Sequence, residues 1–237
     1  MIITSIRALY DKCSDDRRTF LTRAREASEL TIPYLMPPEG HNNSTTFPTP
    51  FQGMGARGVN NLSSKLLLAL LPPNAPFFRL AADYYAMAEQ GVDVDSVKSE
   101  IEKTLGKIER AVQTEFEASN LRIAVFEALK HLIVCGNSLL YVPDDDNVRV
   151  YRLDSYVVKR DPSGTVLAIA TKEGITPDIL DPAIQEMMGL GETTEAGYQK
   201  GKIEQVDLYT CVYREKRRWI IFQEINGTEI PGTRGSY

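Results

Sequence analysis

The chain has 237 residues, which is enough to bury a substantial core in one large domain or two small ones. Its 43% hydrophobic and 25% charged residues are typical of a globular protein and exclude a disordered or fibrous chain. The net charge is −5, from 32 acidic and 27 basic residues. That balance argues against tight binding to a nucleic-acid backbone, because such binding usually needs a basic excess or stripe.

The sequence gives no support for a membrane span, a secretion signal or a zinc site. The longest apolar stretch, Leu62 to Leu71, is interrupted by polar residues and ends at two prolines, so it is too short to span a bilayer. The N-terminus lacks the charged start, apolar core and cleavage site of a signal peptide. Cys13, Cys135 and Cys211 are scattered and form no CxxC pair, which excludes a clustered zinc site and predicts a reduced, cytoplasmic protein.

Helices are expected over the first ~30 residues. Polar residues at 14–16 are expected to cap a second helix whose apolar face carries Phe20, Ala24 and Ala27. The segment from Pro33 to Pro50 contains five prolines and predicts a long loop.

The next helix is expected from Phe51 to Leu71, followed by a short strand from Phe77 to Ala81. Its predicted core face consists of Val59, Leu62, Leu66 and Leu70.

A long amphipathic helix is predicted from Val92 to Ser119. Its apolar stripe recurs at three- and four-residue steps and consists of Val94, Val97, Ile101, Leu105, Ile108, Val112 and Phe116. The stripe could be a coiled-coil seam, but we expect it to pack in the core of the subunit. Asn120 is expected to break this helix, and another helix follows up to Gly136.

Beyond Gly136 the sequence becomes β-branched and aromatic, which predicts strands. They are expected at 137–143, 148–153, 156–160, 165–172, 203–215 and 217–227, with turns at 144–147 and 161–164, a short helix at 178–188 and a flexible excursion near 189–201. Because helices precede strands, the predicted fold class is α+β with a mainly antiparallel sheet.

The segment from Gly53 to Gly58 matches the G-x-G-x-x-G dinucleotide pattern. That pattern binds a pyrophosphate only when a buried strand delivers the glycines to a helix start. The preceding TFPTPFQ cannot be a central strand, and no acidic residue follows before Asp83. We therefore interpret the glycines as allowing a close approach to another backbone, and no cofactor is predicted.

No catalytic or metal site is predicted either. Asp144, Asp145 and Asp146 lack the glycine and distal glutamate of a calcium loop and are interpreted as a solvated turn. His131 lies among apolar residues of a predicted helix, which is typical of a packing residue. The chain is therefore not expected to be an enzyme.

Several blocks of the sequence, in order, resemble the head-to-tail connector (portal) proteins of short-tailed phages. They are TIPYLMP at 31–37, TPFQGMGARGVNNLSSKLLLALLPPNAPFFRL at 49–80, NLRIAVFEALKHLIVCGNSLLYVP at 120–143 and YRLDSYVVKRDPSGTVL at 151–167. The resemblance covers nearly the whole chain, and the second block is the most specific.

The resemblance implies a structural subunit of a ring of about twelve copies at one capsid vertex of the virion. Such a ring is the conduit for genome packaging and ejection and the attachment point for the tail. Its implied partners are the major capsid and scaffolding proteins, the tail adaptor, the terminase, and double-stranded DNA that passes without sequence specificity. No membrane is implied, and the virion would be assembled in the host cytoplasm.

Within that family the chain resembles the N-terminal wing, with residues 1–136 as its helical part and 137–237 as its β-rich part. The stem helices and clip of the longer family members would follow its end, so we expect a fragment of a longer protein or the product of a divided gene, and favour the fragment.

A closed ring needs two different contact surfaces on each subunit. We hypothesise that one of them is the glycine-rich helix start with its polar side; its residues are Gly53, Gly55, Arg57, Asn60, Asn61 and Lys65. The alternative, that these residues only face solvent, stays open. Two other functions also stay open: a non-viral oligomeric scaffold or adaptor module, and a nucleotide-binding enzyme that uses Gly53 to Gly58.

Overall fold

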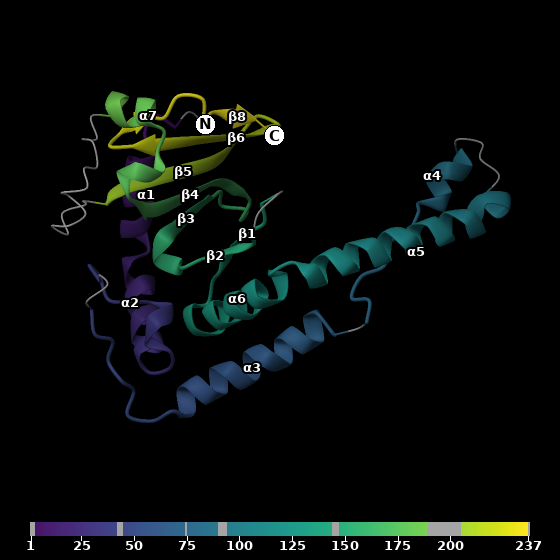
Figure 1. The fold of residues 1–237 in the computed structure, drawn as a ribbon, viewed down its shortest axis with the longest axis horizontal. Helices are drawn as coiled ribbons and strands as arrows, with labels where there is room; N and C mark the ends of the chain where they lie inside the picture. Colours follow the sequence, from purple (N-terminus) through teal and green to yellow (C-terminus); the bar gives the residue numbers. More distant parts are fainter. Residues whose placement is uncertain are drawn as a thin grey trace. The chain divides into compact units, whose positions relative to one another are not determined.

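The computed structural model describes residues 3–41, 45–73, 75–89, 94–143, 147–188 and 205–236. Its helices are α1 (Ile6–Asp16), α2 (Arg18–Glu29), α3 (Met54–Leu70), α4 (Tyr84–Glu89), α5 (Val94–Ala118), α6 (Leu121–Cys135) and α7 (Pro182–Met187), with short 3-10 helices at Pro33–Leu35, Leu153–Ser155 and Pro177–Ile179. Its strands are β1 (Leu139–Tyr141), β2 (Arg149–Tyr151), β3 (Tyr156–Arg160), β4 (Val166–Ile175), β5 (Val206–Glu215), β6 (Arg218–Ile225), β7 (Thr228–Glu229) and β8 (Gly235–Ser236). Helices precede an antiparallel sheet, so the predicted α+β class is confirmed (Figure 1).

The chain forms two compact units, one of residues Met1–Glu26 with Arg152–Tyr237 and one of Ala27–Tyr151. The change from helix to strand falls at Gly136, as predicted, but the units divide the chain elsewhere. The reason is that α1 packs on the late strands β3 to β6, whereas the early hairpin β1–β2 packs against α6.

The first unit is built on one antiparallel sheet with the strand order β3-β4-β5-β6-β7, and β8 also pairs with β6. Alternate residues of its strand β5, namely Tyr209, Cys211 and Tyr213, are buried, which is the pattern of a sheet with one covered face. The predicted turn at 161–164 connects β3 and β4, where the Asp161 side chain accepts hydrogen bonds from Thr165 N at 2.8 Å and Ser163 Oγ at 2.7 Å.

Helix α1 packs against the sheet, and the core of the first unit lies between them (Figure 1). The buried cluster consists of Ile3, Ile6, Tyr10, Val157, Ala168, Ala170, Tyr209, Cys211, Tyr213 and Phe222. The helix begins on Ser5, and the buried carboxylate of Glu224 accepts hydrogen bonds from Ile6 N at 2.6 Å and Arg7 N at 3.3 Å. A carboxylate at a helix N-terminus satisfies free amides and complements the helix dipole, so β6 fixes where α1 starts.

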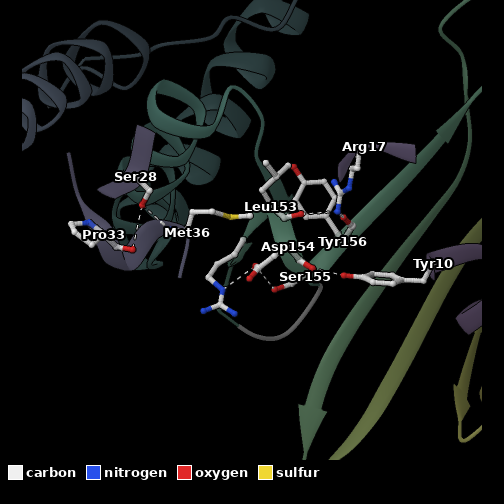
Figure 2. A network of polar contacts seen from close by, with 10 residues as sticks. Tyr10, Arg17, Ser28, Pro33, Met36, Leu153, Asp154, Ser155 and Tyr156 are labelled. Carbon is white, nitrogen blue, oxygen red and sulfur yellow. Dashed lines mark hydrogen bonds and ion pairs between the residues drawn. The ribbon is translucent and has the colours of Figure 1, made fainter. Parts of the chain in front are cut away.

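Two side chains, Tyr10 of α1 and Arg17 directly after its C-terminal end, hold the segment that leads into β3 (Figure 2). Arg17 donates hydrogen bonds to the carbonyls of Leu153 (2.8 Å) and Tyr156, and the Tyr10 hydroxyl donates to the carbonyl of Asp154. Burial lowers the pKa of Arg17 and raises the pKa of Tyr10. Both groups therefore satisfy backbone carbonyls that would otherwise lie unpaired near the core.

The second unit is centred on the packing of α3 against α6 (Figure 1). Helix α6 ends at Gly136, whose φ of 73° is the left-handed conformation that favours glycine at a helix end. Asn120 precedes α6, and its side-chain amide exchanges two hydrogen bonds with the backbone of Val148, at 3.0 and 2.9 Å. Asn120 therefore breaks the helical run, as predicted, and also fixes the chain entering β2.

Several local predictions are wrong. The residues at 14–16 do not cap a helix, since α1 continues to Asp16 and the break falls at Arg17. Phe20 is 38% exposed, and the buried face at that place is Leu21, Ala24 and Ser28. Residues 77–81 form no strand; the rings of Phe77 and Phe78 pack instead on Phe116 of α5.

The expectations for the turn at 144–147 and the excursion near 189–201 fall mainly on residues outside the described ranges.

Candidate subunit interface

The N-terminus of α3 follows an irregular segment, not a strand. Residues 45–53 have no helix or strand, and α3 begins when Arg57 N donates to the carbonyl of Gly53 at 3.0 Å. No buried strand therefore delivers the glycines of Gly53 to Gly58, and the geometry on which dinucleotide binding depends is missing from this part of the chain.

Gly55 lies against the chain that follows α2. A Cβ on Gly55 would lie 2.6 Å from the carbonyl oxygen of Leu30 and 3.1 Å from Cγ2 of Thr31. Gly53 and Gly58 have open space at the same position. The interpretation of the glycines as a close-approach device is therefore confirmed for Gly55, whereas Gly53 and Gly58 approach no other backbone in the described part of this chain.

The segment that receives Gly55 is held by its own hydrogen bonds (Figure 2). Ser28 is fully buried; its hydroxyl donates to the carbonyl of Ile32 at 2.8 Å and accepts from Met36 N at 3.1 Å. Thr31 Oγ1 donates to the carbonyl of Ala27 at 2.7 Å. Since these bonds fix the backbone around Leu30, the start of α3 rests on a rigid support.

The buried face of α3 agrees only in part with the predicted one, of which Val59 is buried and Leu66 half-buried. The side chains turned inward are small and consist of Ala56, Val59 and Ser63, with Val59 packed beside Ile32 and Leu35. Leu62 and Leu70 of the predicted core face are 46% and 54% exposed. Small residues allow the closer approach of α3 to its neighbours, so the leucines are left outside.

The predicted polar residues do gather on the outer face of α3. Gly53, Arg57, Asn60, Asn61 and Lys65 are all exposed, and only Gly55 faces inward. Arg57, Asn61 and Lys65 follow each other at four-residue steps and therefore form one stripe along the helix. Helix α3 contains two basic residues and no acidic one, so this stripe is positively charged.

Exposed apolar side chains extend this face at both ends, which the sequence reasoning missed. Met54 is 74% exposed and Leu68 is 55% exposed, and both lie on the same side of α3 as the polar stripe. Phe51, just before the helix, is fully exposed, and Leu30, at the Gly55 contact, is 74% exposed. Large apolar residues that border exposed polar ones are typical of a protein–protein contact. A heptad-like spacing of Met54, Arg57, Asn61 and Leu68 could have revealed it.

The apolar stripe of α5 is a second incompletely covered surface. Among its described side chains none is buried, and Ile108 is 45% exposed. The expectation that this stripe packs in the core of the subunit is therefore wrong for the part of the chain described. Helix α4 packs against α5, residues 79–81 lie beside Leu105 and Glu109, and the rings of Phe77 and Phe78 pack on Phe116 near its C-terminal end, but Ile108 stays exposed.

Nothing in the described ranges indicates a cofactor or a metal. No group of three or more His, Cys, Asp or Glu side chains there could hold an ion. No described helix is both long and apolar enough to cross a membrane. His131 is buried on α6, as expected for a packing residue.

The profile of one protein family, described as bacteriophage head to tail connecting protein, matches residues 4–230. The chain belongs to this family. Its match spans both compact units and therefore includes the α3 face as well as the sheet.

Similar connector proteins occur in several phages. The chain is 37% identical over 237 residues to the portal protein of Enterobacteria phage T3 and 35% identical over 238 residues to that of Escherichia phage T7. It is 32% identical over 230 residues to the portal protein of Enterobacteria phage SP6. These alignments cover 98%, 98% and 96% of the chain but only 43% of each relative. The chain thus spans less than half the length of the portal proteins it matches.

Proposed function

We propose that this chain is the wing part of a phage portal subunit, with a structural and not a catalytic role. The observation that carries the proposal is the family match over residues 4–230 together with the portal relatives at 32–37% identity. The wing assignment divides the chain into a helical part, 1–136, and a β-rich part, 137–237. In this role it sits in the virion at the head–tail junction, after assembly in the host cytoplasm.

The subunit acts in a closed ring of about twelve copies, through which double-stranded DNA passes during packaging and ejection. The capsid, scaffolding and tail adaptor proteins and the terminase are its proposed partners, the last two through regions outside this chain. Two surfaces support assembly into a ring. The outer face of α3 carries the polar stripe and its apolar borders, and α5 carries an apolar stripe that is only half covered.

Charge favours a contact between these two surfaces on neighbouring copies. Helix α3 carries two basic and no acidic residues, whereas the sequence of α5 carries six acidic and four basic ones. A ring interface joins two different surfaces, so the positive stripe of α3 with its apolar borders complements α5, which has an apolar stripe and two more acidic than basic residues.

The double variant Arg57→Ala/Asn61→Ala tests the interface. Truncating polar groups worth ~0.5–1.5 kcal/mol each should raise the concentration needed for ring assembly roughly tenfold. The matched control is Thr19→Ala/Arg23→Ala on the exposed face of α2, which removes the same charge at the same four-residue spacing and should assemble like the unchanged protein. Light scattering at several protein concentrations measures the effect. Unaltered assembly of the α3 variant would remove α3 from the interface.

A further inference from the structure

A group of basic side chains lies at one end of the sheet in the first compact unit. It consists of Lys159, Arg160, Arg214, Lys216, Arg217 and Arg218, which we call the basic rim. Four of them lie in the run Arg214–Arg218 around the β5–β6 turn. Lys216 adopts a φ of 54° there, which is rare for a residue with a side chain and marks a tight turn.

The strand register brings the other two residues to the same end. Arg160 pairs with Val166 at the start of β4, and two residues later Ala168 pairs with Tyr213 of β5. At the same end of the sheet, Glu215 of β5 pairs with Arg218 of β6. Because neighbouring strands lie ~4.8 Å apart, the rim spans roughly 14 Å from β3 to β6.

All six rim residues are exposed, and their charges are little neutralised. The ion pairs seen among the described residues involve none of them. Arg160 donates to the carbonyl of Gly164 at 2.9 Å, which leaves its charge unpaired. Two carboxylates, Asp161 and Glu215, lie next to the rim in the sequence.

The rim stands out against the charge of the whole chain. With Asp161 and Glu215 it carries +4, while the chain has a net charge of −5, so the remaining residues carry −9. A polyanion is therefore attracted to this end of the sheet and repelled by the net negative charge of the remaining residues, among which the positive stripe of α3 is a local exception.

We propose that the basic rim binds the phosphate backbone of duplex DNA without reading its sequence. Segment 214–219 contains one aromatic residue, Trp219, which pairs with Arg214 and is only partly exposed, so the rim offers no series of rings on which successive unpaired bases could stack. Duplex DNA carries one negative charge per ~1.7 Å of its axis, a density that a rim of this width can match with several contacts. The choice of DNA over other polyanions rests on the proposed portal function.

Such binding is compatible with DNA that moves. Contacts to phosphates alone give dissociation constants of roughly 10⁻⁴–10⁻⁶ M at physiological salt and let a protein slide along the duplex. The acidic remainder of the surface keeps the contact local, so the rim guides the duplex without holding it.

The test uses fluorescence anisotropy with a labelled random-sequence duplex and a salt series from about 50 to about 200 mM. The rim variant is Arg214→Gln/Lys216→Gln/Arg217→Gln/Arg218→Gln. A control with the same charge change, on the exposed sides of α1 and α2 and outside both proposed ring surfaces, is Arg7→Gln/Lys12→Gln/Arg18→Gln/Arg23→Gln. Circular dichroism confirms that each variant is folded.

If the rim neutralises about four phosphates, the affinity of the unchanged protein falls roughly 10²-fold over that salt range. The rim variant should lose at least about tenfold in affinity at the lowest salt and most of its salt dependence, while the control keeps both. Equal affinities of the rim and control variants, or no binding by the unchanged protein, overturn the proposal.

Light scattering on the same samples separates this proposal from the portal function. Loss of DNA binding with normal ring assembly supports the rim as a DNA contact. Loss of assembly in the rim variant with unchanged DNA binding overturns it, because the rim then faces the acidic surface of another copy. DNA binding through the rim by a protein that forms no ring contradicts the portal function alone.

Discussion

The close approach of Gly55 to the backbone of Leu30 predicts opposite outcomes for two glycine substitutions in the same helix. Gly55→Ala places a methyl group 2.6 Å from a carbonyl oxygen, and this oxygen belongs to backbone that Ser28 and Thr31 hold in place. Gly58→Ala, one turn later, meets nothing within 4 Å. Both changes add the same atoms to α3, so their comparison isolates the contact.

The magnitudes follow from two effects. Alanine favours a helix interior over glycine by ~0.5–1 kcal/mol, so Gly58→Ala should stabilise the protein by that amount. Gly55→Ala has the same gain but forces an overpacked contact that costs ~1–3 kcal/mol. The difference between the two variants in the free energy of unfolding should therefore be about 1–3 kcal/mol in favour of Gly58→Ala.

Urea unfolding, followed by circular dichroism at a protein concentration where no ring forms, measures this difference. The slope of the transition should stay constant, so that a change of midpoint reports stability. Thermal unfolding should separate the two variants by roughly 2–4 °C for each kcal/mol. Equal stabilities of Gly55→Ala and Gly58→Ala would refute the view that α3 is seated by this contact.

Three further predictions concern the first compact unit. Glu224→Gln removes the buried charge at the start of α1 and should lower the free energy of unfolding in urea by ~1–3 kcal/mol. The control Glu229→Gln, at an exposed position, should change it by less than about 1 kcal/mol. Similar losses for both variants would contradict the role of Glu224 as the cap of α1. Nη2 of Arg17 donates to both carbonyls, and Arg17→Met removes this donor while it keeps a long side chain, so it should lower stability by ~1–3 kcal/mol. An unchanged urea midpoint would argue against that role. Burial raises the pKa of Cys211 to about 12, so this thiol stays protonated at pH 8. Iodoacetamide should therefore modify the partly exposed Cys13 first, which peptide mapping detects. Early labelling of Cys211 would show that the sheet opens.

The strands were predictable because their signal is local. Each of the predicted strands at 137–143, 148–153, 156–160 and 165–172 contains or overlaps a strand of the structure, β1 to β4. Alternating apolar residues and turn residues specify such elements without knowledge of the partner strand. Gly136 and Asn120 likewise end helices through their own backbone and side-chain preferences.

The burial of the helices was predicted less well, because it depends on distant partners. Helix α3 is rich in leucine on several sides, so periodicity pointed correctly to Val59 but wrongly to Leu62 and Leu70, whereas packing selected the small Ser63 beside Val59. The start of α1 is set by Glu224, which is 218 residues from Ile6 in the sequence. No local pattern contains either piece of information.

The candidate interface was likewise predictable only in part. The polar stripe on α3 follows from residue spacing, and the structure does place its members Arg57, Asn61 and Lys65 on the exposed face. Gly55 could not be separated from Gly53 and Gly58 by sequence, since only the position of Leu30 makes the difference. The basic rim was visible in part as the run of Arg214 to Arg218, but its extension to Lys159 and Arg160 required the sheet register.

Electron microscopy of the intact purified protein tests the portal assignment most directly. The account predicts closed rings of about twelve subunits around a central channel, and the double variant Arg57→Ala/Asn61→Ala should reduce their number at equal protein concentration. A protein that stays monomeric or forms only small oligomers at every concentration tested would contradict the portal assignment.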